Sequence, residues 1–154
     1  MKEYSREQPM KVVSDRNGFG VNYDVHETSE EELLQLWQQS GRSEMEGDAP
    51  TENFIDEHRW SYRSVSVAMG QWGSDGVINA IIRDKYRQDE MEAITNNMAA
   101  INAVFMQTLV SEGIVAATKY LKDSINDENS AKFKEMQEWR RLAKETARGL
   151  FPNN

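Results

Sequence analysis

The strongest periodic signal in this chain is a stripe of apolar residues that begins soon after Gln88. The members of the stripe recur at steps of three or four positions, and they are Met91, Ile94, Met98, Ile101, Phe105 and Leu109. Such steps return to one side of an α-helix, so the spacing predicts a long helix with a single apolar seam. Because the seam covers only about two and a half heptads, it favours packing against a helix of the same fold, although a symmetric dimer would satisfy it too.

Further helical signals lie on both sides of this seam. After Ser74, which we expect to cap a helix, the apolar positions with helical spacing are Val77, Ile78, Ile81, Ile82 and Tyr86. Beyond Gly113 the stripe resumes at Ile114, Thr118, Leu121 and Ile125. The inward face predicted for a last helix, with Asn126-Asp127 as its cap and Pro152 as its stop, comprises Phe133, Met136, Trp139, Arg140, Ala143, Ala147 and Leu150. Residues 74–151 are therefore predicted to form a helical bundle.

The first half of the chain carries a period of two instead. From Phe19 to His26 apolar and polar residues alternate, and Met10–Val13 precedes this run across an Asn17-Gly18 turn. Asn and Gly tolerate positive φ, so the pattern predicts a β-hairpin with one apolar face. A third strand is expected within the β-favouring run from His58 to Met69.

Two segments connect these predicted strands. Ser29 and Glu32 have the spacing of a capping box, which predicts a short helix that ends near Ser40-Gly41. The acidic stretch 42–57 contains Gly47 and Pro50 and has little periodicity, so we expect a flexible loop. The prediction is thus a single α+β domain over 1–154, in which a small antiparallel sheet (10–69) packs with a C-terminal helical bundle (74–151).

Composition excludes several classes of function. The 154 residues contain no cysteine, which removes disulfides, thiol catalysis and thiolate zinc sites. No apolar run approaches a membrane span and the start of the chain is polar, so we expect an intracellular site of synthesis without export. The net charge of −8 disfavours nucleic acid as a partner, and only the segment 132–148 is basic. Trp139 with Arg140, Arg141 and Lys144 could bind nucleic acid there, but an inward-facing tryptophan explains the pattern better.

The residue types needed for catalysis are sparse. Asp24, His26 and Glu27 form the one close group of metal-competent side chains, and a further ligand would have to come from His58 or Asp56. A solvated polar strand face explains the same pattern, so we assign no metal site. No strained turn frames a serine nucleophile, and the glycines near Asn17 lack a phosphate-binding pattern. We therefore expect no enzyme activity, no catalytic residues and no cofactor.

Three motifs resemble those of a known group of proteins. They are the stretch from Trp72-Gly73-Ser74 to Asp84-Lys85-Tyr86, the stretch from Gln88-Asp89-Glu90 to Ile94 with Asn96-Asn97, and Phe133-Lys-Glu-Met-Gln-Glu-Trp-Arg140 with Ala143-Lys144. Together with Lys11–Val13 and Tyr23–Glu27, they resemble uncharacterised small proteins carried by phages and prophages of Bacteroidetes. The run from Met98 to Ser130 departs from that pattern by its extra helical length.

The resemblance implies a role but no mechanism. Genes of this group resemble neighbours of virion and tail genes, which implies a structural or assembly protein that acts by protein–protein contact, with a phage structural protein or a second copy as partner. The resemblance also implies synthesis in the bacterial host cytoplasm and the virion as a final location. A small intracellular regulatory protein that engages a partner through the acidic body or the 42–57 loop is the alternative. A metal-dependent enzyme built on Asp24, His26 and His58 is a third hypothesis.

Overall fold

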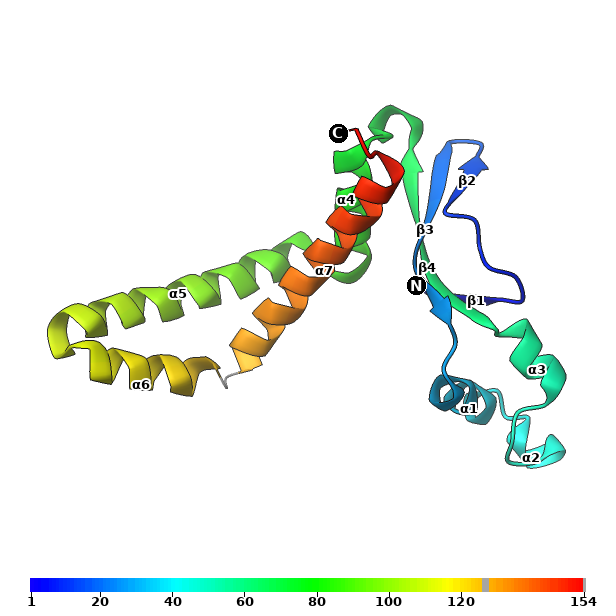
Figure 1. Ribbon diagram of the computed structural model, residues 1–154, viewed down its shortest axis with the longest axis horizontal. Coiled ribbons are helices and arrows are strands. Elements are labelled where there is room, and N and C mark those ends of the chain that lie inside the picture. Colours follow the sequence, from blue (N-terminus) through cyan, green and yellow to red (C-terminus); the bar gives the residue numbers. More distant parts are fainter. Residues whose placement is uncertain (126–127, 154) are drawn as a thin grey trace. The chain divides into compact units, whose positions relative to one another are not determined.

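A computed structural model describes residues 1–125 and 128–153 and has an α+β fold, which confirms the predicted class (Figure 1). The contacts between residues divide the chain into two compact units, Met1–Val77 and Ile78–Asn154. The first unit contains the sheet and the second consists of helices. The assignment of the whole chain to a single domain stays a prediction.

The sheet has four antiparallel strands in the order β1-β4-β3-β2. The predicted hairpin is present as β2 (Val12–Asp15) and β3 (Gly18–Glu27), and the predicted third strand is β4 (Trp60–Ala68). Strand β1 (Lys2–Ser5) was not predicted, because its four residues show no alternation of apolar and polar side chains. The buried face alternates as a strand with one covered side should, and its buried members are Val21, Tyr23, Val65 and Val67.

The hairpin turn differs from the prediction in its physical basis. The register pairs Asp15 with Gly18, so the two turn residues are Arg16 and Asn17. Among the described residues the positions with positive φ are Asp24, Gly41, Gly47 and Gly113, so Asn17-Gly18 does not supply the left-handed conformation that we expected. Gly18 is required for space instead, since a Cβ atom there would lie 2.1 Å from the main-chain oxygen of Val67 on β4.

We expect Gly18→Ala to lower the free energy of unfolding of the sheet unit by about 1–3 kcal/mol, because the added methyl group would push β3 away from β4. Gly20→Ala is the matched control, since the nearest atom to its Cβ would be the main-chain oxygen of Val13 at 3.7 Å, an ordinary contact. Urea unfolding followed by far-UV circular dichroism measures both. Equal losses for the two variants would contradict the steric explanation.

Three helices connect β3 and β4. Helix α1 (Glu30–Gln39) begins as predicted, with the hydroxyl of Ser29 accepting a hydrogen bond from the main-chain N–H of Glu32 at 3.3 Å. The predicted loop 42–57 is wrong in its secondary structure, because it contains α2 (Ser43–Glu46) and α3 (Glu52–Glu57). The hydroxyl of Thr51 caps α3, and the buried ring of Phe54 anchors it against Trp37. One buried aromatic side chain thus fixes a segment that lacks periodicity.

The chain continues through a short 3₁₀ helix, η1 (Met69–Gln71), into α4 (Ser74–Lys85), which begins at Ser74 itself. The long helix predicted from the apolar seam is α5 (Gln88–Glu112), and Gly113, with φ of +89°, separates it from α6 (Ile114–Ile125). The last helix is α7 (Glu128–Leu150). Its predicted cap, Asn126-Asp127, lies outside the described residues.

The buried side chains of the helical unit come mainly from α7, and α5 contributes none. The buried side chains of this unit are Ile81, Tyr86, Ala117, Ser130, Met136, Ala143 and Ala147. None of the 25 residues of α5 is fully buried, but its six seam residues are half-buried and α5 contacts both α6 and α7, so the seam packs against helices of the same fold, as predicted, without complete burial. The reason is geometric, because α6 has only 12 residues and cannot cover the full length of α5.

Candidate functional site

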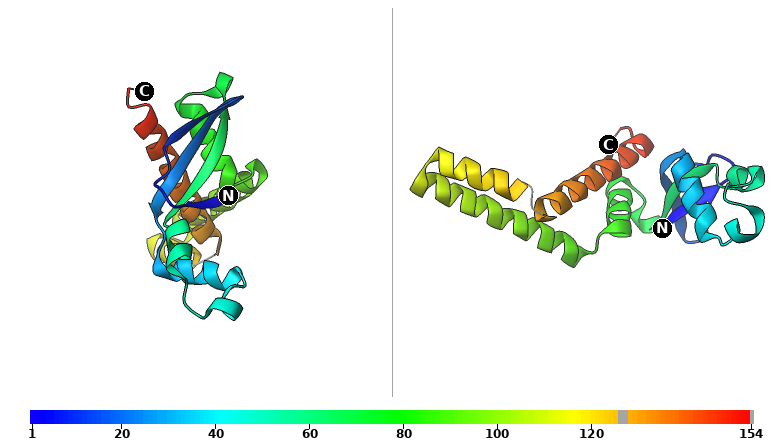
Figure 2. Two further views of the ribbon diagram at one scale, coloured as in Figure 1. Left: turned by 90° about the vertical axis from the view of Figure 1, so that its right-hand side faces the viewer. Right: turned by 90° about the horizontal axis from the view of Figure 1, so that it is seen from below.

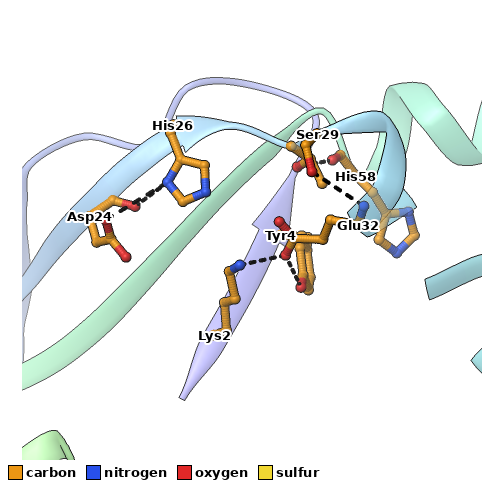
Figure 3. A network of polar contacts seen from close by, with 8 residues as sticks. Lys2, Tyr4, Asp24, His26, Ser29, Glu32 and His58 are labelled. Atoms are coloured by element: carbon orange, nitrogen blue, oxygen red, sulfur yellow. Dashed lines mark hydrogen bonds and ion pairs between the residues drawn. The ribbon is translucent and has the colours of Figure 1, made fainter. Parts of the chain in front are cut away.

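The residues considered as metal ligands lie on β3 and at the end of α3. The ladder between β3 and β4 is irregular between Tyr23 and His26, and Asp24 has φ of +53° there. This bulge brings the Nδ1 atom of His26 to 2.9 Å from the main-chain oxygen of Asp24, whereas the Asp24 carboxylate lies at 3.8 Å (Figure 3). The nearest partner of the imidazole is therefore a backbone carbonyl.

The other candidate ligands make separate contacts. The Nδ1 atom of His58 lies 2.9 Å from the main-chain oxygen of Phe54, and the two rings stack with centroids 4.1 Å apart. Asp56 forms an ion pair with Arg6 at 3.0 Å. Over residues 1–125 and 128–153 no group of three or more His, Asp or Glu side chains is arranged to hold a metal ion. The geometry thus gives the hypothesis of a metal-dependent enzyme no support.

A polar network that the sequence did not reveal connects β1 to α1. The Tyr4 hydroxyl donates a hydrogen bond to Oε1 of Glu32 at 2.7 Å, and the Lys2 ammonium lies 2.5 Å from the same oxygen (Figure 3). A surface hollow of about 380 Å³ lies beside this network, and half of its lining residues are polar residues of α1. No sequence motif predicts the network, because the pairing of β1 with β4 is what brings Lys2 and Tyr4 close to Glu32.

The electrostatics of this network indicate a structural role. Burial raises the pKa of the Glu32 carboxyl, but the hydrogen bonds from Lys2 and Tyr4 outweigh that effect and leave the pKa below its usual value. Burial and the hydrogen bond to Glu32 raise the pKa of Tyr4 to about 12. The tyrosine is therefore protonated and the carboxylate ionised at neutral pH, a stable donor–acceptor pair rather than an acid and base poised for proton transfer.

We expect the Glu32 ion pair to stabilise the fold above the ordinary carboxyl pKa and to lose that effect in acid. A lowered folded-state pKa means that protonation favours unfolding, so the stability advantage of the wild type over Glu32→Gln is complete at neutral pH and shrinks below about pH 4.5. Urea unfolding of both proteins at pH 7 and at about pH 3 measures the difference. Glu31→Gln, an exposed neighbour on the same helix, is the control. An advantage that grows in acid would refute this assignment.

The basic segment of α7 does not present a free aromatic surface. The indole N–H of Trp139 donates a hydrogen bond to the main-chain oxygen of Ile81 at 2.9 Å, and the Lys85 ammonium lies 4.6 Å from the ring centroid. Trp139 thus packs toward α4, as its position on the inward face predicted. Arg141 is engaged by Glu145 at 3.0 Å, and Lys132 by Glu128 at 2.7 Å. The structure offers no stacking platform for nucleic acid at this position.

The most unusual surface of the helical unit is at the end of the α5–α6 hairpin. Figures 1 and 2 show α5 and α6 side by side, and their contacts agree. We use the name hairpin tip for five exposed apolar side chains near the turn at Gly113. They are Val104 (41% exposed), Met106 (55%), Val110 (85%), Ile114 (70%) and Val115 (82%).

Charge is almost absent from the sequence around the hairpin tip. Between Glu92 and Lys119 the one charged residue is Glu112, whereas 29% of the whole chain is charged. An exposed helix on a protein of this composition would ordinarily carry a charged face. The hairpin therefore combines exposed apolar side chains with a scarcity of charge that is unusual for a protein surface.

Comparison with known proteins adds no assignment. No protein-family model, no curated protein and no solved structure matches the chain. Among the described residues, none of the helices has the length and apolar character that crossing a bilayer requires.

Proposed function

We propose that this chain is a non-enzymatic protein that acts by protein–protein contact through the hairpin tip. The observation that carries the proposal is the exposure of five large apolar side chains on a helical hairpin with a single charged residue between positions 93 and 118. The resemblance of its motifs to small proteins of Bacteroidetes phages and prophages supports a more specific role, that of a structural or assembly component of a phage particle.

The free energy of the exposed side chains favours a contact. Burying one Val, Ile or Met side chain is worth about 1.5–3 kcal/mol, so a partner that covers most of the hairpin tip gains several kcal/mol from desolvation alone. Isolated apolar residues on a surface have little meaning, but Val110, Ile114 and Val115 lie within three residues of the turn at Gly113, and each is at least 70% exposed. A clustered apolar surface of this kind is typical of interaction sites.

The non-enzymatic part of the proposal rests on how the polar side chains are used. The Nδ1 atoms of His26 and His58 lie against backbone carbonyls, and the half-buried Glu32 carboxylate is held by the Lys2 ammonium and the Tyr4 hydroxyl. Neither arrangement leaves an activated base or nucleophile directed at a cavity.

A site-specific cross-linking experiment tests the proposal. A photo-reactive amino acid at Val110 is expected to give covalent protein adducts in cells that produce the phage, and mass spectrometry should identify the adduct as a particle protein or as the chain itself. The same probe at Met45 is the matched control, because both side chains are 85% exposed and Met45 lies in the other unit. Equal labelling from both positions, or none from Val110, would contradict the proposal. An adduct with a host regulator would favour the alternative of a host-directed regulatory protein.

A further inference from the structure

We infer that the hairpin tip binds the hairpin tip of a second copy of this chain, so that two α5–α6 hairpins pack as a four-helix contact. The inference rests on the proposed function and names the partner of the same surface. It is independent of the phage assignment, because it uses only charge, length and exposure in the helical unit.

The distribution of charge favours a contact between two copies of this stretch. In a symmetric dimer the same surface of both copies meets, so each charged group on the twofold axis faces its own kind. The chain has 26 acidic and 18 basic residues, and most of its surface would bring like charges together in such a contact. The stretch 93–118, with Glu112 as its one charged residue, is where two copies can meet without desolvating a set of like charges.

The apolar seam of α5 is only partly covered within the chain. Its apolar residues follow steps of three and four, the spacing with which helices pack in bundles, yet all six are only half-buried. Helix α5 is about 37 Å long by its rise per residue, whereas α6 covers about half of that length. Helix α7 contacts α5 as well, yet the seam residues nearest the turn, Ile101, Phe105 and Leu109, remain half-buried, and a second hairpin would cover them further.

A lipid surface fits this stretch less well. Segments that lie on membranes usually place Lys and Arg beside their apolar face, where they meet anionic headgroups. Within 93–118 there is neither Lys nor Arg, and the one charged residue is acidic. A second protein surface of the same neutral, apolar character fits the composition better.

The test is the mass of the full-length chain in solution. Light scattering during size-exclusion chromatography is expected to give twice 17.7 kDa for the wild type and 17.7 kDa for the double variant Val110→Asp, Val115→Asp. A buried unpaired carboxylate on each helix should raise the dissociation constant about 100-fold or more. Met45→Asp, a substitution at an equally exposed apolar residue outside the hairpin, should leave the dimer intact.

A second measurement distinguishes loss of dimerisation from loss of folding in the variants. Circular dichroism should give the same helix content for all variants, and the pair Val110→Ser, Val115→Ser serves if the aspartates unfold the hairpin. A monomeric wild type overturns the inference, as does a dimer that survives both pairs of substitutions or is lost equally in Met45→Asp. A monomer with a Val110-specific adduct to another protein overturns the inference alone. Sedimentation with phosphatidylglycerol vesicles that the Val110/Val115 variant loses, without any protein adduct, overturns the proposed function as well.

Discussion

Trp37→Ala is expected to lower the free energy of unfolding of the sheet-containing unit by about 3–5 kcal/mol, enough to leave it largely unfolded if its stability is ordinary. The indole is completely buried, and its ring meets that of Phe54 edge-on with centroids 5.0 Å apart. Its N–H donates a hydrogen bond to the main-chain oxygen of Gly47 at 2.8 Å. One side chain thus ties α1 to the segment that contains α2 and α3.

Leu34→Ala is the matched control, because Leu34 lies on the same helix and is 40% exposed. Its loss should be below about 1 kcal/mol, since most surface substitutions have small effects. Urea unfolding of both variants, followed by far-UV circular dichroism, compares them without relying on tryptophan fluorescence. If the two variants lost the same stability, Trp37 would not be the anchor of this part of the fold.

The contact between Trp37 and α3 also shows why the sequence predicts some elements and not others. The β2–β3 hairpin and α5 follow from local periodicity, which is a property of neighbouring residues and can be seen without a tertiary structure. Helix α3 has six residues and one buried side chain, Phe54, too few to produce a period. Its position depends on Trp37, which is distant in sequence. Local patterns cannot contain that information.

The Tyr4–Glu32 network and the hairpin tip also differ in how far the sequence predicts them. The contact of Tyr4 with Glu32 joins residues 28 positions apart through a strand that has no apolar alternation, so no sequence motif predicts it. The near absence of charge from 93 to 118 is visible in the sequence. What the sequence could not decide is whether that stretch is buried, because burial depends on which helices are long enough to cover it. In the structure the seam of α5 is half-buried, and none of the helix's residues is fully buried.

The second large effect is expected at Trp139, where Trp139→Ala should lower the free energy of unfolding of the helical unit by about 3–5 kcal/mol. The indole ties α7 to α4 through its hydrogen bond to the main-chain oxygen of Ile81, and Lys85 lies over the ring while its ammonium pairs with Glu135 at 2.6 Å. Trp139→Phe keeps an aromatic ring but removes the donor, so it should lose about 1–2 kcal/mol.

Arg141→Ala is the control for Trp139, since this exposed arginine pairs only within its own helix among the described contacts and should cost about 0.5 kcal/mol or less. Thermal unfolding by circular dichroism ranks the three variants. A Phe variant as unstable as the Ala variant would mean that the hydrogen bond to Ile81 matters more than the ring. Because this packing holds α7 without using the α5 seam, the Trp139 variants should weaken the helical unit even where the hairpin tip is covered by a partner.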